Sequence, residues 1–123
     1  MTKKKQKSIK EMVSKIAAAV LVAELLTSPT ALAFDIQGEA KVVVVEPTYM
    51  PGYVTFQLDT DIGPCKAYTW LYWYARGPDQ ASQNANVAAA YSTFLTAVST
   101  GMTVKLYGNS GNCSFDFLNL KRP

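Results

Sequence analysis

The sequence predicts a small α+β domain in which five strands and one helix follow the order β-β-β-α-β-β. Three observations favour this fold class. The chain has 123 residues, and its first 33 have the composition of a secretory signal, which leaves 90 residues for one domain. Those 90 residues contain several short segments with alternating or β-branched apolar residues, as strands do. One longer segment has apolar residues at helical spacing and predicts a single helix.

The N-terminal segment 1–33 has the three-part order of a cleaved export signal. Lysines are concentrated in its first ten residues, an apolar run covers 16–23, and a polar patch precedes a small-x-small sequence that ends at Ala33. We therefore expect cleavage before Phe34 and a periplasmic or secreted protein without stable membrane insertion. A permanent membrane anchor is the alternative, but the apolar run is shorter than the roughly 20 residues of a spanning helix, and Glu24 interrupts it.

Removal of this segment changes the charge of the protein. The whole chain has a formal net charge of +3, but six of its twelve basic residues lie in 1–33. Segment 34–123 keeps six basic and seven acidic residues, which gives it a net charge of −1. Nucleic-acid-binding domains usually carry a basic patch, and the pair Lys121-Arg122 is too small to supply one. We therefore expect no nucleic-acid partner.

The two cysteines of the chain, Cys65 and Cys113, both lie in the exported segment. Oxidising conditions outside the cytoplasm favour a disulfide between them. A metal site and a reactive thiol are the alternatives, but two thiols in a chain without histidine cannot complete a closed zinc site. Because a domain of 90 residues buries a limited core, we expect this disulfide to reinforce it. We expect neither a metal nor a cofactor.

The first half of segment 34–123 predicts three strands that follow a loosely held leader, 34–40. The β-branched run 41–46 predicts the first strand. Segment 53–58 alternates between apolar and polar residues and predicts the second strand, half-buried. Segment 68–75 is rich in aromatic residues and predicts the third strand.

The second half predicts one helix and two further strands. Apolar residues recur at helical spacing over 81–100, and Gly101 lies where a left-handed C-terminal cap is expected. Segments 102–107 and 113–120 predict the fourth and fifth strands. The predicted core takes one face from the helix and from three of the strands: Val54, Phe56, Leu58, Tyr91, Phe94, Leu95, Val98, Val104, Leu106, Phe115 and Phe117.

Several of these features together resemble a known family. Cys65, the aromatic strand with Trp70, the helix end 91–101, the strand 103–107 and Cys113 follow an arrangement similar to that of small exported bacterial proteins related to the B subunit of subtilase cytotoxin. The resemblance implies an OB-like antiparallel barrel or curved sheet crossed by one helix. It also implies an oligomeric glycan-binding protein, because those toxin subunits form pentameric rings that bind host-cell glycans. No glycan-contacting residue of the family can be placed on a position of this chain.

The sequence gives little support for catalysis. The chain has no histidine, which removes the commonest general base and the Ser-His and Cys-His nucleophile pairs. Asp59 and Asp61 could form half of a calcium site or a carboxylate pair for hydrolysis. Aspartates in a loop more often bond their local backbone, which is the interpretation we favour. We therefore expect a non-enzymatic binding module without catalytic residues.

The best candidate for a functional surface is the aromatic segment 68–75. Alternate residues of a strand share a face, so Tyr68, Trp70, Tyr72 and Tyr74 form one face, and Leu71, Trp73 and Ala75 form the other. This surface is either a stacking platform for sugar rings, a subunit interface, or one packed face and one exposed face without a function. Its candidate residues are Tyr68, Trp70, Tyr72, Trp73 and Tyr74, which Tyr49, Tyr53 and Tyr107 could extend.

Two hypotheses for the function follow. The first is an exported binding module, oligomeric and glycan-binding like the toxin subunits. The second is a monomeric periplasmic module that has a structural role or binds a partner protein.

Overall fold

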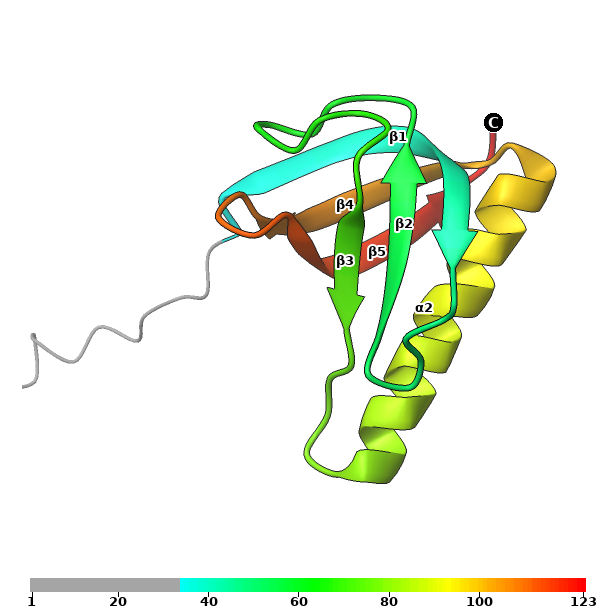
Figure 1. The fold of residues 1–123 in the computed structure, drawn as a ribbon. Coiled ribbons are helices and arrows are strands. Elements are labelled where there is room, and N and C mark those ends of the chain that lie inside the picture. The colour runs from blue at the N-terminus through cyan, green and yellow to red at the C-terminus, as the bar shows by residue number, and fades with distance from the viewer. Residues whose placement is uncertain (1–33) are drawn as a thin grey trace, which may run out of the picture. The chain divides into compact units, whose positions relative to one another are not determined.

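In the computed structural model, which describes residues 34–123, five strands and one helix form a small α+β barrel (Figure 1). The strands close into a ring in the order β1-β2-β3-β5-β4. The predicted fold class and the order β-β-β-α-β-β are confirmed. The predicted signal 1–33 lies outside the described residues. The elements are β1 Ile36–Glu46, β2 Tyr53–Leu58, β3 Leu71–Tyr74, α2 Gln80–Thr100, β4 Thr103–Asn109 and β5 Ser114–Lys121.

Strand β1 is long because it pairs with two neighbours. Residues 36–41 pair with β4, and the remainder of the strand pairs with β2. A register shift between Val42 and Val44 marks the irregularity at which the strand turns from one neighbour to the other, as Figure 1 shows. The prediction of a loosely held leader at 34–40 was therefore wrong. Residues 36–40 lack a β-branched run, and their place in the sheet depends on pairing with distant β4.

The barrel is mixed, whereas the predicted barrel was wholly antiparallel. The β3–β5 contact is parallel, with Tyr72 opposite Ser114, and it closes the ring. The other strand pairings are antiparallel. Helix α2 connects β3 to β4 and makes the long crossover that allows β5 to lie parallel to β3.

Strand β3 is shorter than the predicted strand 68–75. Residues 68–70 belong to the preceding loop, where Tyr68 has a φ of 58°. A residue in the left-handed region cannot continue an extended strand. The backbone N–H of Tyr68 instead donates to the carbonyl of Leu58 at 2.9 Å, which fixes the end of the loop against β2.

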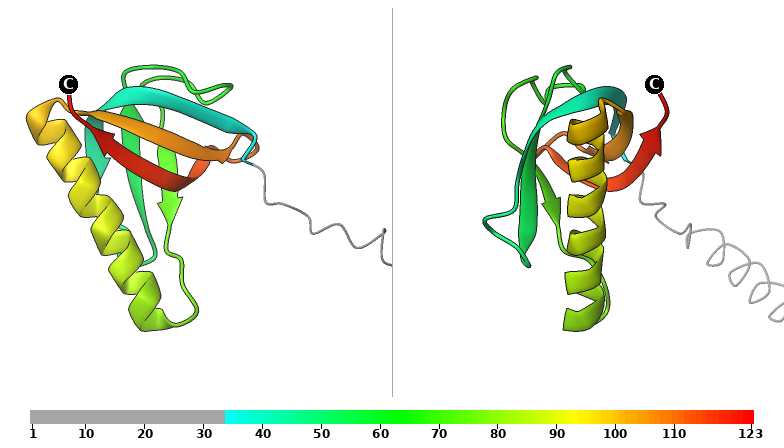
Figure 2. Two further views of the ribbon diagram at one scale, coloured as in Figure 1. Left: turned by 180° about the vertical axis from the view of Figure 1, so that it is seen from behind. Right: turned by 90° about the vertical axis from the view of Figure 1, so that its right-hand side faces the viewer.

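Helix α2 lies along one side of the barrel, and its N-terminal turns extend beyond the strand ends (Figure 2). It begins after Asp79, whose carboxylate accepts a hydrogen bond from the backbone N–H of Ser82 at 2.7 Å. It ends at Gly101, which has a φ of 71°, as predicted. The side chains that it buries against the barrel are Val87, Ala90, Phe94 and Ala97. The ring of Phe94 stacks on Phe56 with 4.1 Å between centroids.

Leu95, which we predicted in the core, is 43% exposed. Two of the four side chains that the helix buries are alanines, so Ala90 and Ala97 occupy positions for which we predicted larger side chains. Tyr91 and Val98 are partly buried and pack against the core. Close packing of a helix against a sheet favours small residues at the contact, and for this reason Leu95 lies outside the core.

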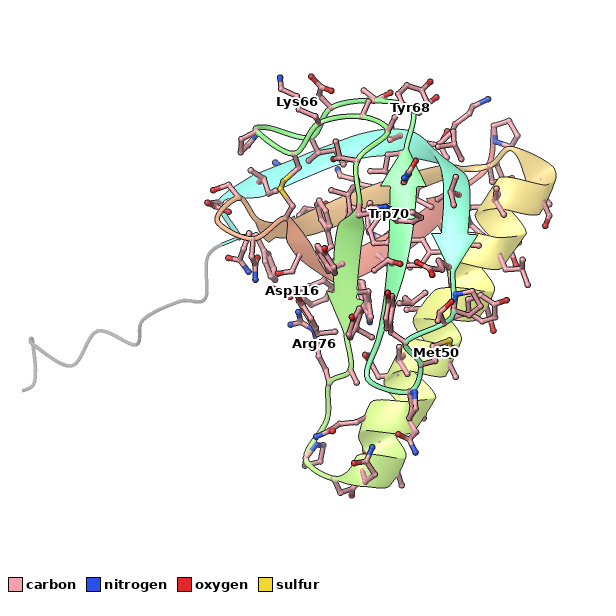
Figure 3. The ribbon with its side chains drawn as sticks, in the orientation of Figure 1. Met50, Lys66, Tyr68, Trp70, Arg76 and Asp116 are labelled. Carbon is pink, nitrogen blue, oxygen red and sulfur yellow. A yellow bond between two sulfur atoms is a disulfide. The ribbon has the colours of Figure 1, made fainter. Side chains whose placement is uncertain are left out.

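Phe117 was also predicted in the core, and it is 58% exposed. The register between β4 and β5 shifts because Asp116 is an extra residue on β5, between Phe115 and Phe117. Phe115 therefore faces the core and Phe117 faces outward. The carboxylate of Asp116 forms an ion pair with Arg76, and the two side chains lie side by side in Figure 3.

Candidate functional site

Four tyrosines gather on the outer face of β2 and β3. Tyr53 in β2 lies opposite Tyr74 in β3, and Tyr72 lies two positions before Tyr74 on the same face. Tyr49 joins them from the turn between β1 and β2. Tyr49, Tyr53, Tyr72 and Tyr74 are referred to below as the tyrosine cluster.

The rings of the tyrosine cluster contact one another. Tyr49 stacks on Tyr53 with 4.9 Å between centroids and 13° between planes, and Tyr72 stacks on Tyr74 at 5.8 Å and 7°. Tyr53 joins the two pairs, since its ring lies 5.6 Å from Tyr74 and 6.1 Å from Tyr72. Such mutual packing holds the rings in place and leaves aromatic surface for a ligand. Tyr49 and Tyr74 are 49% and 40% exposed.

A pocket of about 140 Å³ adjoins the tyrosine cluster. Strands β1, β2 and β3 supply most of its walls, and Trp70 adds a side chain from the loop directly before β3. Trp70 is 46% exposed, and Figure 3 shows it beside β2 and β3. The residues that line the pocket are Glu46, Tyr49, Tyr53, Thr55, Trp70 and Tyr72.

The two residues of the pocket that are not aromatic are Glu46 and Thr55, which lie opposite each other in β1 and β2. The Thr55 hydroxyl donates to Glu46 Oε2 at 2.9 Å and thereby orients the carboxylate. The pKa of Tyr53 is raised above its ordinary value of 10.0, first by desolvation and then by the neighbouring tyrosines and Glu46. The tyrosine hydroxyl therefore stays neutral at physiological pH and can donate a hydrogen bond.

The aromatic residues of 68–74 that we predicted to form one functional surface lie in three different surroundings. Trp70 and Tyr72 line the pocket, and Tyr74 lies in the tyrosine cluster. Tyr68 is 64% exposed on the loop before β3 and does not line the pocket. Trp73 is buried in the core, where its indole N–H donates to Asn86 Oδ1 of α2 at 3.0 Å.

Two pocket residues were missed by the sequence analysis. Thr55 shares a predicted strand face with Tyr53, which was a usable signal. Glu46 ends the β-branched run of β1 and carries no signal of its own, because its approach to the tyrosines depends on the register between β1 and β2.

The predicted disulfide between Cys65 and Cys113 is confirmed. It joins the loop between β2 and β3 to the residue before β5, with 5.6 Å between the two Cα atoms. The same loop carries Trp70, and it is further held by the N–H of Ala67, which donates to Asp61 Oδ1 at 2.7 Å. The disulfide therefore restrains the segment that supplies one wall of the pocket.

Asp59 and Asp61 bond to their surroundings as loop aspartates do. Asp59 accepts from the backbone N–H of Lys41 at 2.8 Å, and Asp61 forms an ion pair with Lys66 at 3.2 Å. The hydrogen bond from the Ala67 N–H, followed by that from Lys66, lowers the pKa of Asp61. Within residues 34–123, no group of three His, Cys, Asp or Glu side chains lies close enough to hold a metal ion.

A second aromatic surface lies on the outer face of β4 and β5. Phe117 contacts Phe34 with 5.3 Å between ring centroids, and Lys105 Nζ lies 5.4 Å from the centroid of Tyr107. Phe34, Tyr107, Phe117 and Asn119 line an open groove of about 420 Å³, referred to below as the β4–β5 groove. Tyr107 therefore belongs to this groove and does not extend the tyrosine cluster.

Comparisons with protein-family models, with curated proteins and with solved structures gave no match. The resemblance to the B subunit of subtilase cytotoxin therefore stays a prediction. In the part of the chain that the structure describes, no helix has the length and apolar character needed to cross a membrane.

Proposed function

We propose that the protein is an exported, non-enzymatic binding module that holds sugar rings on the tyrosine cluster and in the adjoining pocket. The observation that carries this proposal is the arrangement of three tyrosines of the cluster and Trp70 around a pocket with a carboxylate. Sugars present apolar C–H faces that stack on aromatic rings, and their hydroxyls bond to carboxylate and tyrosine oxygens.

The position of the pocket in the fold supports the same proposal. In OB-like barrels, the outer face of the second and third strands and the adjoining loops bind oligosaccharides and oligonucleotides. Here Tyr53 and Thr55 come from β2, Tyr72 comes from β3, and Tyr49 comes from the loop before β2. A net charge of −1 in segment 34–123 favours a sugar over a polyanionic nucleic acid.

The disulfide supports the exported location, because such bonds persist in oxidising compartments. Mass spectrometry of protein collected from the periplasm or the medium tests this part of the proposal. The expected mass is that of a chain that begins at Phe34 and has an oxidised cysteine pair. A chain that retains residues 1–33 would contradict export with cleavage.

A glycan array, followed by titration of each hit, tests the binding proposal. The chain has two tryptophans, and Trp70 is 46% exposed in the pocket whereas Trp73 is 5% exposed in the core. A bound sugar should therefore change the fluorescence of Trp70. We expect Tyr72→Ala to weaken binding by about fivefold or more, since stacking on an aromatic side chain is worth about 1–3 kcal/mol.

Tyr68→Ala is the matched control, because Tyr68 is an exposed tyrosine outside the pocket. It should leave the affinity unchanged. Equal loss of binding in both variants, or the absence of any glycan signal, would contradict the proposal.

A partner-protein-binding or self-associating module is the second candidate, and the β4–β5 groove favours it. Phe117 is the most exposed phenylalanine of the described chain, and exposed aromatic groups are enriched in protein interfaces. Native mass spectrometry of the wild-type protein and of Phe117→Ser tests this candidate. An oligomer that dissociates in the variant would place a subunit interface at the groove, and a monomer in both proteins would leave the groove without a self-association role.

A further inference from the structure

The pocket beside the tyrosine cluster combines aromatic rings with one negative charge. Its aromatic lining consists of three tyrosines and Trp70, and its charged group is Glu46. The face of an aromatic ring attracts a cation through its quadrupole, and several rings around one site form a cage for ammonium groups. A carboxylate within the cage adds a charge partner and a hydrogen-bond acceptor.

Glu46 keeps the capacity to bind a cation. Among residues 34–123, no lysine or arginine forms an ion pair with it, whereas Glu39 pairs with Lys121 and Asp61 pairs with Lys66. Its Oε2 accepts from the neutral hydroxyl of Thr55 at 2.9 Å. A carboxylate has about four acceptor positions on two oxygens, so positions remain for an incoming N–H donor.

The neighbour that orients the carboxylate is itself buried. Thr55, whose hydroxyl donates to Glu46 Oε2, is 3% exposed, so the hydrogen bond joins the carboxylate to the buried part of β2. A negative charge held among aromatic rings attracts a positively charged group.

The pocket is small, with a volume of about 140 Å³. An ammonium group with its carbon attachment fits that space. The remainder of a sugar chain would then lie over the adjacent rings of Tyr53 and Tyr74, which contact each other at 5.6 Å.

We propose that this pocket selects sugars that carry a protonated amino group, as de-N-acetylated hexosamines do, with the ammonium group between Glu46 and the aromatic rings. The inference rests on the proposed sugar binding at the same site and names the class of sugar. The carboxylate discriminates in both directions, because it attracts a cationic sugar and repels an anionic one such as a uronic acid. The expected order of affinity is therefore cationic, then neutral, then anionic.

The test compares two trisaccharides with the same backbone. Protein produced from the full-length chain and collected after export is titrated by calorimetry with the glucosamine trimer and with the N-acetylglucosamine trimer. The buffer has low salt and is acidic enough to protonate the amines. We expect the glucosamine trimer to bind at least about tenfold more tightly, the scale of a cation–π contact combined with an ion pair.

Two variants separate the pocket charge from the overall charge. Glu46→Gln keeps an acceptor for Thr55 and removes the charge, so the preference for the glucosamine trimer should fall to about twofold or less. Glu39→Gln removes one negative charge from the other half of β1, where Glu39 pairs with Lys121 at 2.7 Å. The preference should survive in this control.

The outcomes distinguish the inference from the proposed function. Equal affinity for the two trimers, tighter binding of the acetylated trimer, or an undiminished preference in Glu46→Gln would overturn the inference and leave sugar binding in place. Failure of both trimers to bind, together with an empty glycan array, would overturn both.

Discussion

Removal of the disulfide should destabilise the domain, and the length of the loop that the bond closes determines by how much. Cys65 and Cys113 are 48 positions apart, and the bond between them closes a loop that contains β3, α2 and β4. In the chain-entropy account, closure of a loop of 48 residues in the unfolded chain corresponds to about 4 kcal/mol at room temperature. That is a large share of the roughly 5–15 kcal/mol that stabilises a typical domain.

The perturbation is the double substitution Cys65→Ala with Cys113→Ala, and its effect is measured by urea unfolding of the purified protein. We expect the free energy of unfolding to fall by about 4 kcal/mol and the Tm to fall by on the order of 20 °C, given the small size of the domain. Reduction of the wild-type protein should produce a similar loss, since both changes free the same loop. A loss below about 1 kcal/mol would refute the loop-closure argument.

Two further predictions concern the core and the acid sensitivity of the fold. Phe94 is fully buried against Phe56, so Phe94→Ala should lower the free energy of unfolding in urea by about 3–5 kcal/mol. Leu95→Ala, at the exposed neighbouring position, should lower it by less than about 1 kcal/mol. Similar losses in the two variants would contradict the helix orientation. Hydrogen bonds from the Ser110 side chain and backbone lower the pKa of Asp35 from its ordinary value of 3.8. The ionised Asp35 carboxylate therefore stabilises the fold above pH 3.8, and this stabilisation is lost as the pH falls through the lowered pKa of the folded protein. The difference in Tm between wild type and Asp35→Asn should therefore narrow in acid, and a difference that widens would contradict this assignment.

Local sequence patterns predicted much of the fold. The alternation of 53–58 placed Val54 and Phe56 in the core correctly, and Gly101 marked the end of the helix. The location of both cysteines after the predicted export signal predicted their disulfide. Each of these features depends on neighbouring residues or on simple chemistry, which a sequence displays directly.

Features that depend on pairing between distant strands were not predictable in the same way. Residues 36–40 look unstructured until β4 lies beside them, and the exposure of Phe117 depends on the extra residue Asp116 in the β4–β5 register. The candidate site has the same origin. Glu46 approaches Trp70 and Tyr72 because β1, β2 and β3 are neighbours in the barrel, so the sequence displayed the aromatic residues but not the carboxylate beside them.

The most direct test of the central claim is a two-dimensional NMR titration that locates a bound amino sugar on the protein. Isotopically labelled protein is titrated with the glucosamine trimer, and the change in each backbone amide signal is measured. We predict the largest changes at Glu46, Thr55 and Tyr72, with little change at Phe117. Changes that cluster around Phe117 and the β4–β5 groove, with none at the pocket, would contradict it.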